Sequence, residues 1–204
     1  MNAEDWDRRY AGNEYVWHLE PNRFLPGLVE DLPAGGRALD LACGEGRNAV
    51  WLAEQGWSVT AVDYSSVGVD KGRRLAADRG VEVEWVVADV TTWAAPSGAF
   101  DLVVVFYVQL PGPDRAAMLA TAASALAPGG RFVMVAHDLD NLTRGVGGPQ
   151  DASVLPTPAL VTTDLLAAGV DGLVIDRAEQ LVRGVDTDAG PREAIDCLVV
   201  ATRR

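Results

Sequence analysis

Residues 38–49 read Ala-Leu-Asp-Leu-Ala-Cys-Gly-Glu-Gly-Arg-Asn-Ala, and this run sets the expectations for the rest of the chain. An apolar strand leads into a glycine turn, and the turn leads directly into a helix. Such a turn brings bare backbone and a helix N-terminus close to a ligand. The run also fits the G-x-G-x-x-G/A pattern of dinucleotide-binding proteins, so it does not by itself identify the ligand. We expect three acidic residues to distinguish between the possible ligands: Asp40, Asp63 and Asp89.

The composition is that of an ordinary globular protein. The chain has 204 residues, of which 49% are hydrophobic and 23% charged. A chain of this length can bury roughly 70% of its unfolded surface as one domain. A net charge of −12 argues against a protein that binds the nucleic-acid backbone, which needs clustered Lys and Arg. A small or cationic ligand stays open, as does the alternative that the charge serves solubility alone.

We expect no metal site, no disulfide and no membrane segment. The two cysteines, Cys43 and Cys197, lack zinc-type spacing and are expected to stay reduced. The acidic N-terminus has no apolar core of a signal peptide. The longest apolar run, residues 102–108, is far shorter than the ~18 residues of a membrane span. The sequence therefore predicts a cytoplasmic protein with a small-molecule partner, no nucleic-acid or membrane partner, and a monomeric or weakly homodimeric state.

Apolar runs alternate with helical patterns through most of the chain. Near-continuous apolar strands separated by helices are typical of a parallel sheet covered on both faces. The expected strands are Arg37–Ala42, Ser58–Asp63, Val81–Ala88, Phe100–Phe106 and Arg131–Ala136. The expected helices between them are Asn48–Gln55, Ser66–Asp78 and Asp114–Leu126.

The C-terminal portion has a different pattern. Two strand-like runs, Gly172–Val182 and Glu193–Thr202, are separated by a joint, residues 183–191, that holds no helix. Two strands joined in this way should form an antiparallel hairpin. We therefore predict an α/β fold with a Rossmann-like seven-stranded sheet, mostly parallel, closed by a C-terminal hairpin and covered by helices on both faces.

We expect one domain, 1–204, with four parts. Residues 1–36 form an N-terminal helical lead-in, and residues 37–136 form the core that holds the ligand. Residues 137–158 form a long loop beyond a strand's carboxyl end, where ligands of open α/β sheets bind. Loops of that length are uncommon unless they are functional or disordered, and both alternatives stay open. Residues 159–204 contain a helix and the terminal hairpin.

Five ordered motifs resemble those of the class I S-adenosylmethionine-dependent methyltransferases. They are the acidic-x-x-x-Gly-x-Gly run from Asp40 to Gly46, then Val62–Ser65, Val87–Val90, Phe100–Val103 and Leu126–Arg131. Each motif is weak alone, but five in the same order and spacing are specific. The resemblance implies S-adenosylmethionine as cofactor and S-adenosylhomocysteine as product.

The residues fit the parts of that cofactor. Gly44 and Gly46 let the backbone approach its amino acid portion, while the helix N-terminus near Asn48 favours the carboxylate. Asp40 can accept from its ammonium and Asp63 from both ribose hydroxyls. Asp89 can accept from the adenine amino group, and the Val90 N–H can donate to the ring. Each acid also has a structural alternative, namely capping of its own turn. Two neighbours, Tyr64 and Phe106, complete the predicted cofactor site of the core.

The lead-in resembles that of the thiopurine and tellurite-resistance methyltransferase group. Trp6, Tyr10 and Trp17 match the spacing of its aromatic residues, which implies that the segment folds over the cofactor. Aromatic faces attract a sulfonium cation, although these residues can equally be packing side chains of an amphipathic helix. A dinucleotide oxidoreductase shares Gly44 and Asp63, but that reading explains neither Asp40 nor the hairpin.

Three residues near strand ends are candidate bases, His137, Asp138 and Tyr107, and we assign catalysis to His137 and Tyr107. A soft acceptor such as a thiol, a thiopurine or a metalloid oxyanion needs no strong base, whereas an amine or hydroxyl usually does. A lone histidine is more often structural. The Asn/Asp-Pro-Pro-aromatic motif of amino-methylating nucleic-acid enzymes is absent at residues 106–109. We expect a small-molecule acceptor, with a protein methyltransferase or a non-catalytic cofactor-binding module as alternatives.

Overall fold

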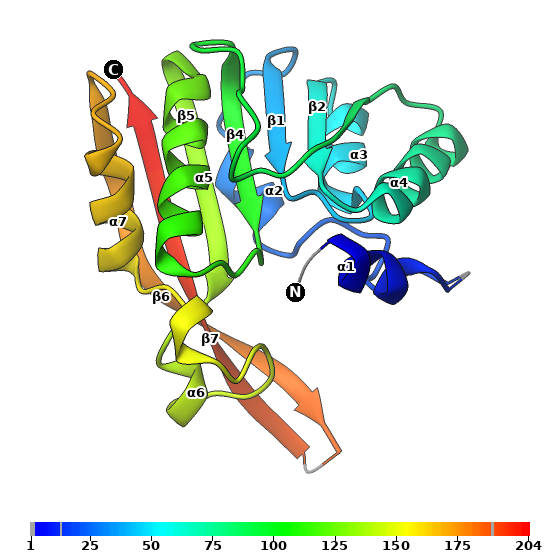
Figure 1. Cartoon of the computed structure of the whole chain (residues 1–204), viewed down its shortest axis with the longest axis vertical. Coiled ribbons are helices and arrows are strands. Elements are labelled where there is room, and N and C mark those ends of the chain that lie inside the picture. Colours follow the sequence, from blue (N-terminus) through cyan, green and yellow to red (C-terminus); the bar gives the residue numbers. More distant parts are fainter. Residues whose placement is uncertain (1–2, 13, 189) are drawn as a thin grey trace.

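The computed structural model describes residues 3–12, 14–188 and 190–204. A single seven-stranded sheet runs through the molecule in the order β3-β2-β1-β4-β5-β7-β6 (Figure 1). The strands are β1 (Arg37–Leu41), β2 (Ser58–Asp63), β3 (Glu84–Val87), β4 (Phe100–Phe106), β5 (Leu126–His137), β6 (Leu173–Thr187) and β7 (Gly190–Arg203). The first five are parallel, and β7 is antiparallel to both β5 and β6. The predicted Rossmann-like sheet with its closing hairpin is therefore confirmed.

Helices cover both faces of the sheet. The helical elements are α1 (Ala3–Tyr10), α2 (Leu25–Val29), α3 (Arg47–Glu54), α4 (Ser66–Arg79), α5 (Gly112–Ala125), α6 (Asn141–Arg144), the 3-10 turn η1 (Ala152–Val154) and α7 (Pro158–Ala167). Helices α5 and α7 pack on one face, where Met118 and Val161 join a core with Leu39 and Leu41 of β1. Helices α2 and α3 pack on the other, where Leu25 and Leu52 meet the opposite side of β1. The central strands read as continuous apolar runs because both of their faces are buried.

Three expected boundaries were wrong. Strand β3 spans only Glu84–Val87, because residues 81–83 precede the ladder with β2. Strand β5 begins at Leu126, five residues earlier than expected. The joint predicted at residues 183–191 is largely strand, since β6 continues to Thr187 and β7 begins at Gly190. The hairpin therefore extends past the carboxyl edge of the parallel strands (Figure 1).

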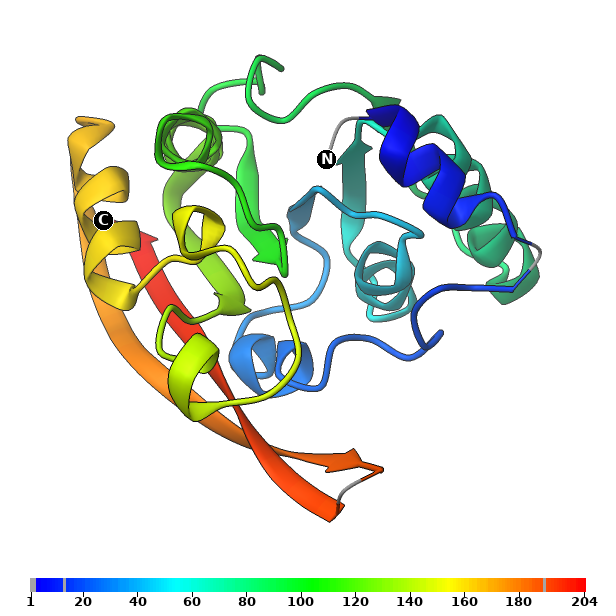
Figure 2. The same cartoon turned by 60° about the horizontal axis from the view of Figure 1, so that its bottom comes forward.

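The carboxyl edge of the sheet gathers the segments that surround the candidate site. Figure 2 shows α1, the turn after β1, α6 and the terminal hairpin around this edge. Parallel strands end at one edge, so the loops that follow them meet there. In the described part of the chain, no helix combines the length and apolar character needed to cross a lipid bilayer.

Candidate cofactor and acceptor site

The glycine turn holds a carboxyl group that lacks a full set of partners. Asp40 is only 1% exposed, and its Oδ2 atom has no hydrogen-bond partner among the described residues. Burial, followed by the nearby Asp63, raises the pKa of Asp40 to about 8, against the pull of the Ala49 backbone N–H. A buried, unsatisfied carboxyl oxygen is costly. A ligand that donates hydrogen bonds at this point would remove that cost.

A guanidinium group lies on the same side of the turn. Arg47 opens α3 and lies near enough to Asp40 and Glu45 for their carboxylate charges to favour its charged form. Burial lowers the pKa of Arg47, and its side chain makes no hydrogen bond or ion pair within residues 3–12, 14–188 and 190–204. Asp40 and Arg47 together thus present an acceptor and a donor at one helix N-terminus. That pairing suits a ligand with an ammonium and a carboxylate.

Asp63 ties the glycine turn to the start of α4. It is 5% exposed, and its two oxygens accept from the Gly44 N–H and the Ser65 N–H, each at 2.8 Å. Burial raises the pKa of Asp63, while these backbone donors oppose the rise. A carboxylate offers about four acceptor sites, so Asp63 keeps capacity for a further donor beside its backbone partners. The predicted ribose role is compatible with this geometry and stays a prediction.

The two glycines of the turn have different neighbours. A Cβ atom built on Gly44 would lie 2.9 Å from the Tyr10 hydroxyl oxygen, so Gly44 faces the lead-in. A Cβ atom on Gly46 would lie 2.3 Å from the Trp85 ring, which also presses on Gly72 of α4. Gly46 has φ +81°, a conformation that L side chains rarely adopt. Its lack of a side chain therefore serves the packing of Trp85 as well as the turn.

The remaining predicted cofactor residues of the core occupy the next strand ends. Asp89 is exposed, and its Oδ1 accepts from the Thr91 N–H at 2.9 Å and the Thr91 hydroxyl at 2.7 Å. These two hydrogen bonds correspond to the turn-capping alternative for Asp89. They leave Asp89 Oδ2 outside the cap. Burial, with Asp63 and Asp89 nearby, raises the pKa of Tyr64 to about 12. Val90 and Phe106 are buried in the core at 7% and 8% exposure.

The lead-in lies against this edge through α1. Trp6 and Tyr10 contact each other with ring centroids 5.3 Å apart, and Tyr10 is buried. Arg9 lies over both Trp6 and Trp17, at 5.0 and 5.2 Å from the ring centroids. Trp17 is 42% exposed, so its face is accessible from solvent. Asp7 accepts from the hydroxyl of Ser65, the residue that caps α4, which fixes α1 on that helix.

A buried ion pair holds the next part of the lead-in. Glu45 and Lys71 lie 2.9 Å apart at 3% and 4% exposure. Glu45 also accepts from the Val16 and Trp17 N–H groups, and Lys71 donates to the Glu14 carbonyl at 2.6 Å. We call this group the Glu45–Lys71 clamp.

Asn48 anchors the lead-in further along. Its Oδ1 accepts from the Asn22 N–H at 2.8 Å, so this oxygen is engaged with the lead-in rather than facing a ligand. The side chain is 6% exposed. A cofactor role of Asn48 would therefore fall to its backbone N–H at the helix start.

Four side chains meet at the other end of the edge, and we call them the Asp196 cluster. Asp196 of β7 is 0% exposed, and its Oδ2 accepts from the Tyr107 hydroxyl at 2.8 Å and from Arg183 Nε at 2.6 Å. Its Oδ1 lies 3.2 Å from His137 Nδ1, within ion-pair distance but without the alignment of a hydrogen bond. Burial acts to raise the pKa of Asp196, but its contacts with His137, Tyr107 and Arg183 outweigh burial and lower it.

The loop of residues 137–158 is folded over this cluster. It contains α6, whose Asn141 accepts from the Ile195 N–H of β7 at 2.8 Å and donates to the Gly147 carbonyl. Gly148 lies so close to the His137 ring that a Cβ atom there would be 2.6 Å from it. The loop therefore packs on the histidine instead of extending into solvent.

The comparisons with known proteins agree with this geometry. Residues 38–130 match the family described as a methyltransferase domain. The middle of the chain is therefore similar to this methyltransferase family, and the chain shares the fold of solved S-adenosylmethionine-dependent methyltransferases. This similarity implies S-adenosylmethionine as the cofactor. The matched range contains Asp40, Arg47, Asp63 and Asp89, but not the lead-in or the terminal hairpin.

The individual relatives of this chain are distant. The 2-heptyl-1-hydroxyquinolin-4(1H)-one methyltransferase of Mycobacteroides abscessus is 26% identical over 67% of this chain and 62% of its own. The structure titled for conversion of a disulfide bond into a thioacetal group during echinomycin biosynthesis has a TM-score of 0.73, with 20% identity over 98% of this chain and 92% of the other. A TehB-like methyltransferase from Corynebacterium glutamicum has a TM-score of 0.62, with 19% identity over 99% and 96%. The chain spans 34% to 62% of the length of the first curated relatives.

Several residues of the candidate site were not found by sequence reasoning. Arg47 was available from its place at the first helical position after the turn. Glu45 and Lys71 gave no signal, because a surface pair and a buried pair look alike in sequence. Arg183 lay in the supposed joint, and Asp196 lay within an apolar strand pattern.

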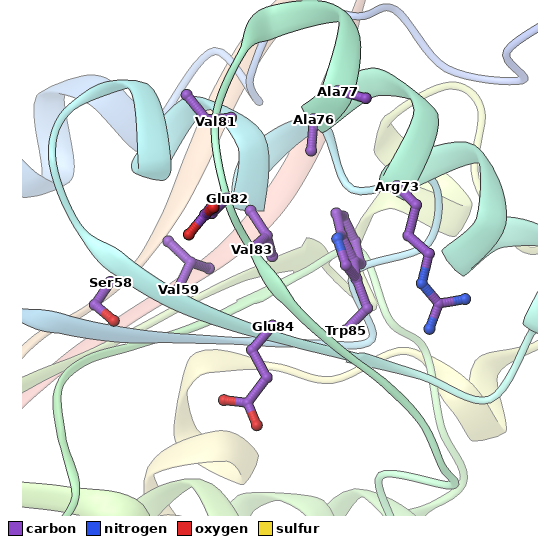
Figure 3. A pocket seen from close by; sticks show the side chains of 10 residues that line it. All are labelled: Ser58, Val59, Arg73, Ala76, Ala77, Val81, Glu82, Val83, Glu84 and Trp85. Atoms are coloured by element: carbon purple, nitrogen blue, oxygen red, sulfur yellow. The ribbon is translucent and has the colours of Figure 1, made fainter.

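A cavity lies elsewhere in the molecule. It has a volume of about 550 Å³ and lies between α4 and the first residues of β2 and β3 (Figure 3). Its walls include Ser58, Val83, Glu84 and Trp85, and none of the predicted site residues. Strands β2 and β3 begin here, so the cavity is at the amino edge of the sheet, opposite to the glycine turn. Ligands of such sheets bind at the carboxyl edge.

Proposed function

We propose that this protein transfers a methyl group from S-adenosylmethionine to a small molecule. The observation that carries the proposal is the pair formed by Asp40 Oδ2 and the Arg47 guanidinium beside the glycine turn, neither of which has a hydrogen-bond partner among the described residues. These two groups complement the ammonium and the carboxylate of the cofactor's amino acid end. A dinucleotide carries no ammonium there, and it brings phosphates that this acidic chain is poorly equipped to neutralise.

The other predicted residues are proposed to bind the remaining parts of the cofactor. Asp63 keeps acceptor capacity for the ribose hydroxyls, and Asp89 keeps one oxygen for the adenine amino group. Trp6, Tyr10 and Trp17 lie along the lead-in that borders the turn. When bound, the cofactor supplies a methyl group activated by a positive sulfur. The protein then has to hold the acceptor atom close to the methyl carbon and in line with the bond to sulfur. Such positioning can lower the activation barrier by ~7–11 kcal/mol.

For the acceptor we propose a thiol, a thiopurine or a metalloid oxyanion, or another small nucleophile of similar size. The relative from Mycobacteroides abscessus, whose name gives a hydroxyquinolinone as its acceptor, supports a small acceptor. The excess of acidic residues disfavours nucleic acid. A cytoplasmic location and a monomeric or weakly dimeric state are part of the same proposal.

The first test is a thermal-shift measurement with S-adenosylhomocysteine and with NAD. A ligand at 100 times its Kd stabilises the folded state by about 2.7 kcal/mol. We expect S-adenosylhomocysteine to raise the Tm of the wild type, and Arg47→Ala with Asp40→Asn to lose most of that shift. Arg73→Ala, an exposed arginine on α4, is the matched control and should keep it. Stabilisation by NAD alone would refute the proposal.

A second test separates the classes of acceptor. Radiolabelled S-adenosylmethionine is supplied with the protein in a cell extract, and small-molecule and protein fractions are counted separately. We expect label in small molecules. Label only in protein would indicate a protein methyltransferase, and binding without any transfer would indicate a non-catalytic module.

A further inference from the structure

The Asp196 cluster brings together side chains that the sequence places up to 89 residues apart. Asp196 is fully buried, and Arg183 with Tyr107 donates to one of its oxygens. These donors favour the ionised carboxylate. An ionised carboxylate can only accept hydrogen bonds. The oxygen that faces His137 is therefore a fixed acceptor.

That acceptor decides which ring nitrogen of His137 carries the hydrogen. Asp196 Oδ1 lies 3.2 Å from Nδ1, and both atoms are buried without another partner in the described residues. Neutral His137 must then hold its hydrogen on Nδ1, which leaves a lone pair on Nε2. Hydrogen bonds of catalytic groups are often misaligned before the reactants bind, as this one is.

Tyr107, another candidate base, is engaged differently. Its hydroxyl donates to Asp196, and burial followed by the Asp196 charge raises the pKa of the phenol. A phenol that holds its proton this firmly is a poor base near neutral pH. Tyr107 has a φ of +55°. The edge of its ring contacts the His137 ring, with centroids 4.9 Å apart, so Tyr107 supports the imidazole.

The cluster is close to the glycine turn and sheltered from water. Val105 of β4 pairs with Leu41 of β1, so Tyr107 and the glycine turn follow the ends of neighbouring strands. His137 ends β5, the next strand, which places it roughly 10 Å from the turn at ~4.8 Å per strand. Its side chain is 15% exposed, and Gly148 covers one side of the ring.

We infer that His137, oriented by Asp196, is the general base of this enzyme and that the acceptor is a small molecule with a weakly acidic hydroxyl group. Asp196 and Arg183 are positioning residues. The inference rests on the proposed function and narrows it, because a thiopurine or a metalloid oxyanion needs no such base. In the transfer, a lone pair of the hydroxyl oxygen forms the new C–O bond to the methyl carbon. The C–S bond breaks with its electron pair going to sulfur, and the hydroxyl proton moves to His137 Nε2 and then to water.

The tautomer of His137 can be measured without any substrate. The chain has two histidines, so long-range ¹H–¹⁵N spectra with His18→Gln assign the His137 ring directly. We expect the Nδ1–H form in the wild type at a pH where the ring is neutral, and a shift to Nε2–H in Asp196→Asn. Asp164→Asn, which breaks the Arg115 ion pair between α5 and α7, is the control and should leave the tautomer unchanged. An Nε2–H ring in the wild type overturns the inference.

The acceptor class is tested with 1-hydroxyquinolin-4-one, 6-mercaptopurine and tellurite as probes. We expect methylation of the hydroxyl probe, and a fall in kcat of roughly 10²-fold or more in His137→Gln. The affinity of that variant for S-adenosylhomocysteine should not change. A wild type that binds S-adenosylhomocysteine but methylates only mercaptopurine or tellurite, or none of the three, overturns the hydroxyl class. A wild type that binds no S-adenosylhomocysteine instead refutes the proposed function.

Discussion

At the scale of single residues, the Asp40 carboxyl is buried beside a second carboxyl, which makes its ionisation costly. Burial, with Asp63 nearby, raises its pKa from 3.8 to about 8. Between those values the folded protein binds one more proton at this group than the unfolded chain does. Stability from this group is therefore present below pH 4 and is lost as the pH rises toward 8. Near neutral pH the buried Asp40 carboxyl therefore lowers the free energy of unfolding of the ligand-free protein.

Asp40→Asn should remove that part of the pH dependence. We expect the ligand-free variant to be more stable than the wild type at pH 8 by at least about 1.4 kcal/mol, the value of one pKa unit, and to gain less at pH 5. Urea unfolding at the two pH values measures this. Asp70→Asn, an exposed acid on α4, should keep the wild-type slope. Equal slopes for Asp40→Asn and the wild type would contradict the assignment.

At the scale of elements, the lead-in is held to the core by the Glu45–Lys71 clamp. Breaking a buried ion pair leaves one charge without a partner and costs about 3–5 kcal/mol. Here the same carboxylate also holds two backbone N–H groups of residues 16 and 17. Loss of the clamp should therefore loosen a specific segment as well as destabilise the fold.

We expect Glu45→Gln to lower the free energy of unfolding by about that amount and to speed amide exchange at residues 14–17. Hydrogen exchange with mass spectrometry and urea unfolding measure the two effects. The matched control is again Asp70→Asn, because the Asp70–Arg73 pair lies on the same helix but is exposed. Unchanged exchange in the lead-in of Glu45→Gln would show that the clamp does not hold it.

At the scale of the whole molecule, burial falls from the middle of the sheet to its edges. Six of the seven β4 residues are buried, whereas β3 is half exposed and β6 is exposed along most of its length. Local opening is easiest where few apolar contacts hold a strand. We expect amides of β1, β4 and the second half of β5 to exchange only through global unfolding, and those of β3 and β6 to exchange sooner. Exchange at a uniform rate across the sheet would contradict this gradient.

Much of the fold was predictable because its signals are local. Strands β2 and β4 have the bounds that the apolar runs predicted, since a central parallel strand is apolar on both faces. Asp40 and Asp63 were placed at the site because they stand in or directly after such strands. The family motifs lie in the same local segments.

The sequence alone therefore determined the sheet, the glycine turn and the acids around it. Only the tertiary structure decided that Trp85 fills the space beside Gly46, that Glu45 pairs with Lys71, and that Asp196 meets His137. The physical reason is register. The β6–β7 ladder pairs Arg183 with Ala194 and so brings it beside Asp196, and the β5–β7 ladder pairs His137 with Asp196 directly. Such pairings depend on how long strands align across the sheet, which no local pattern records.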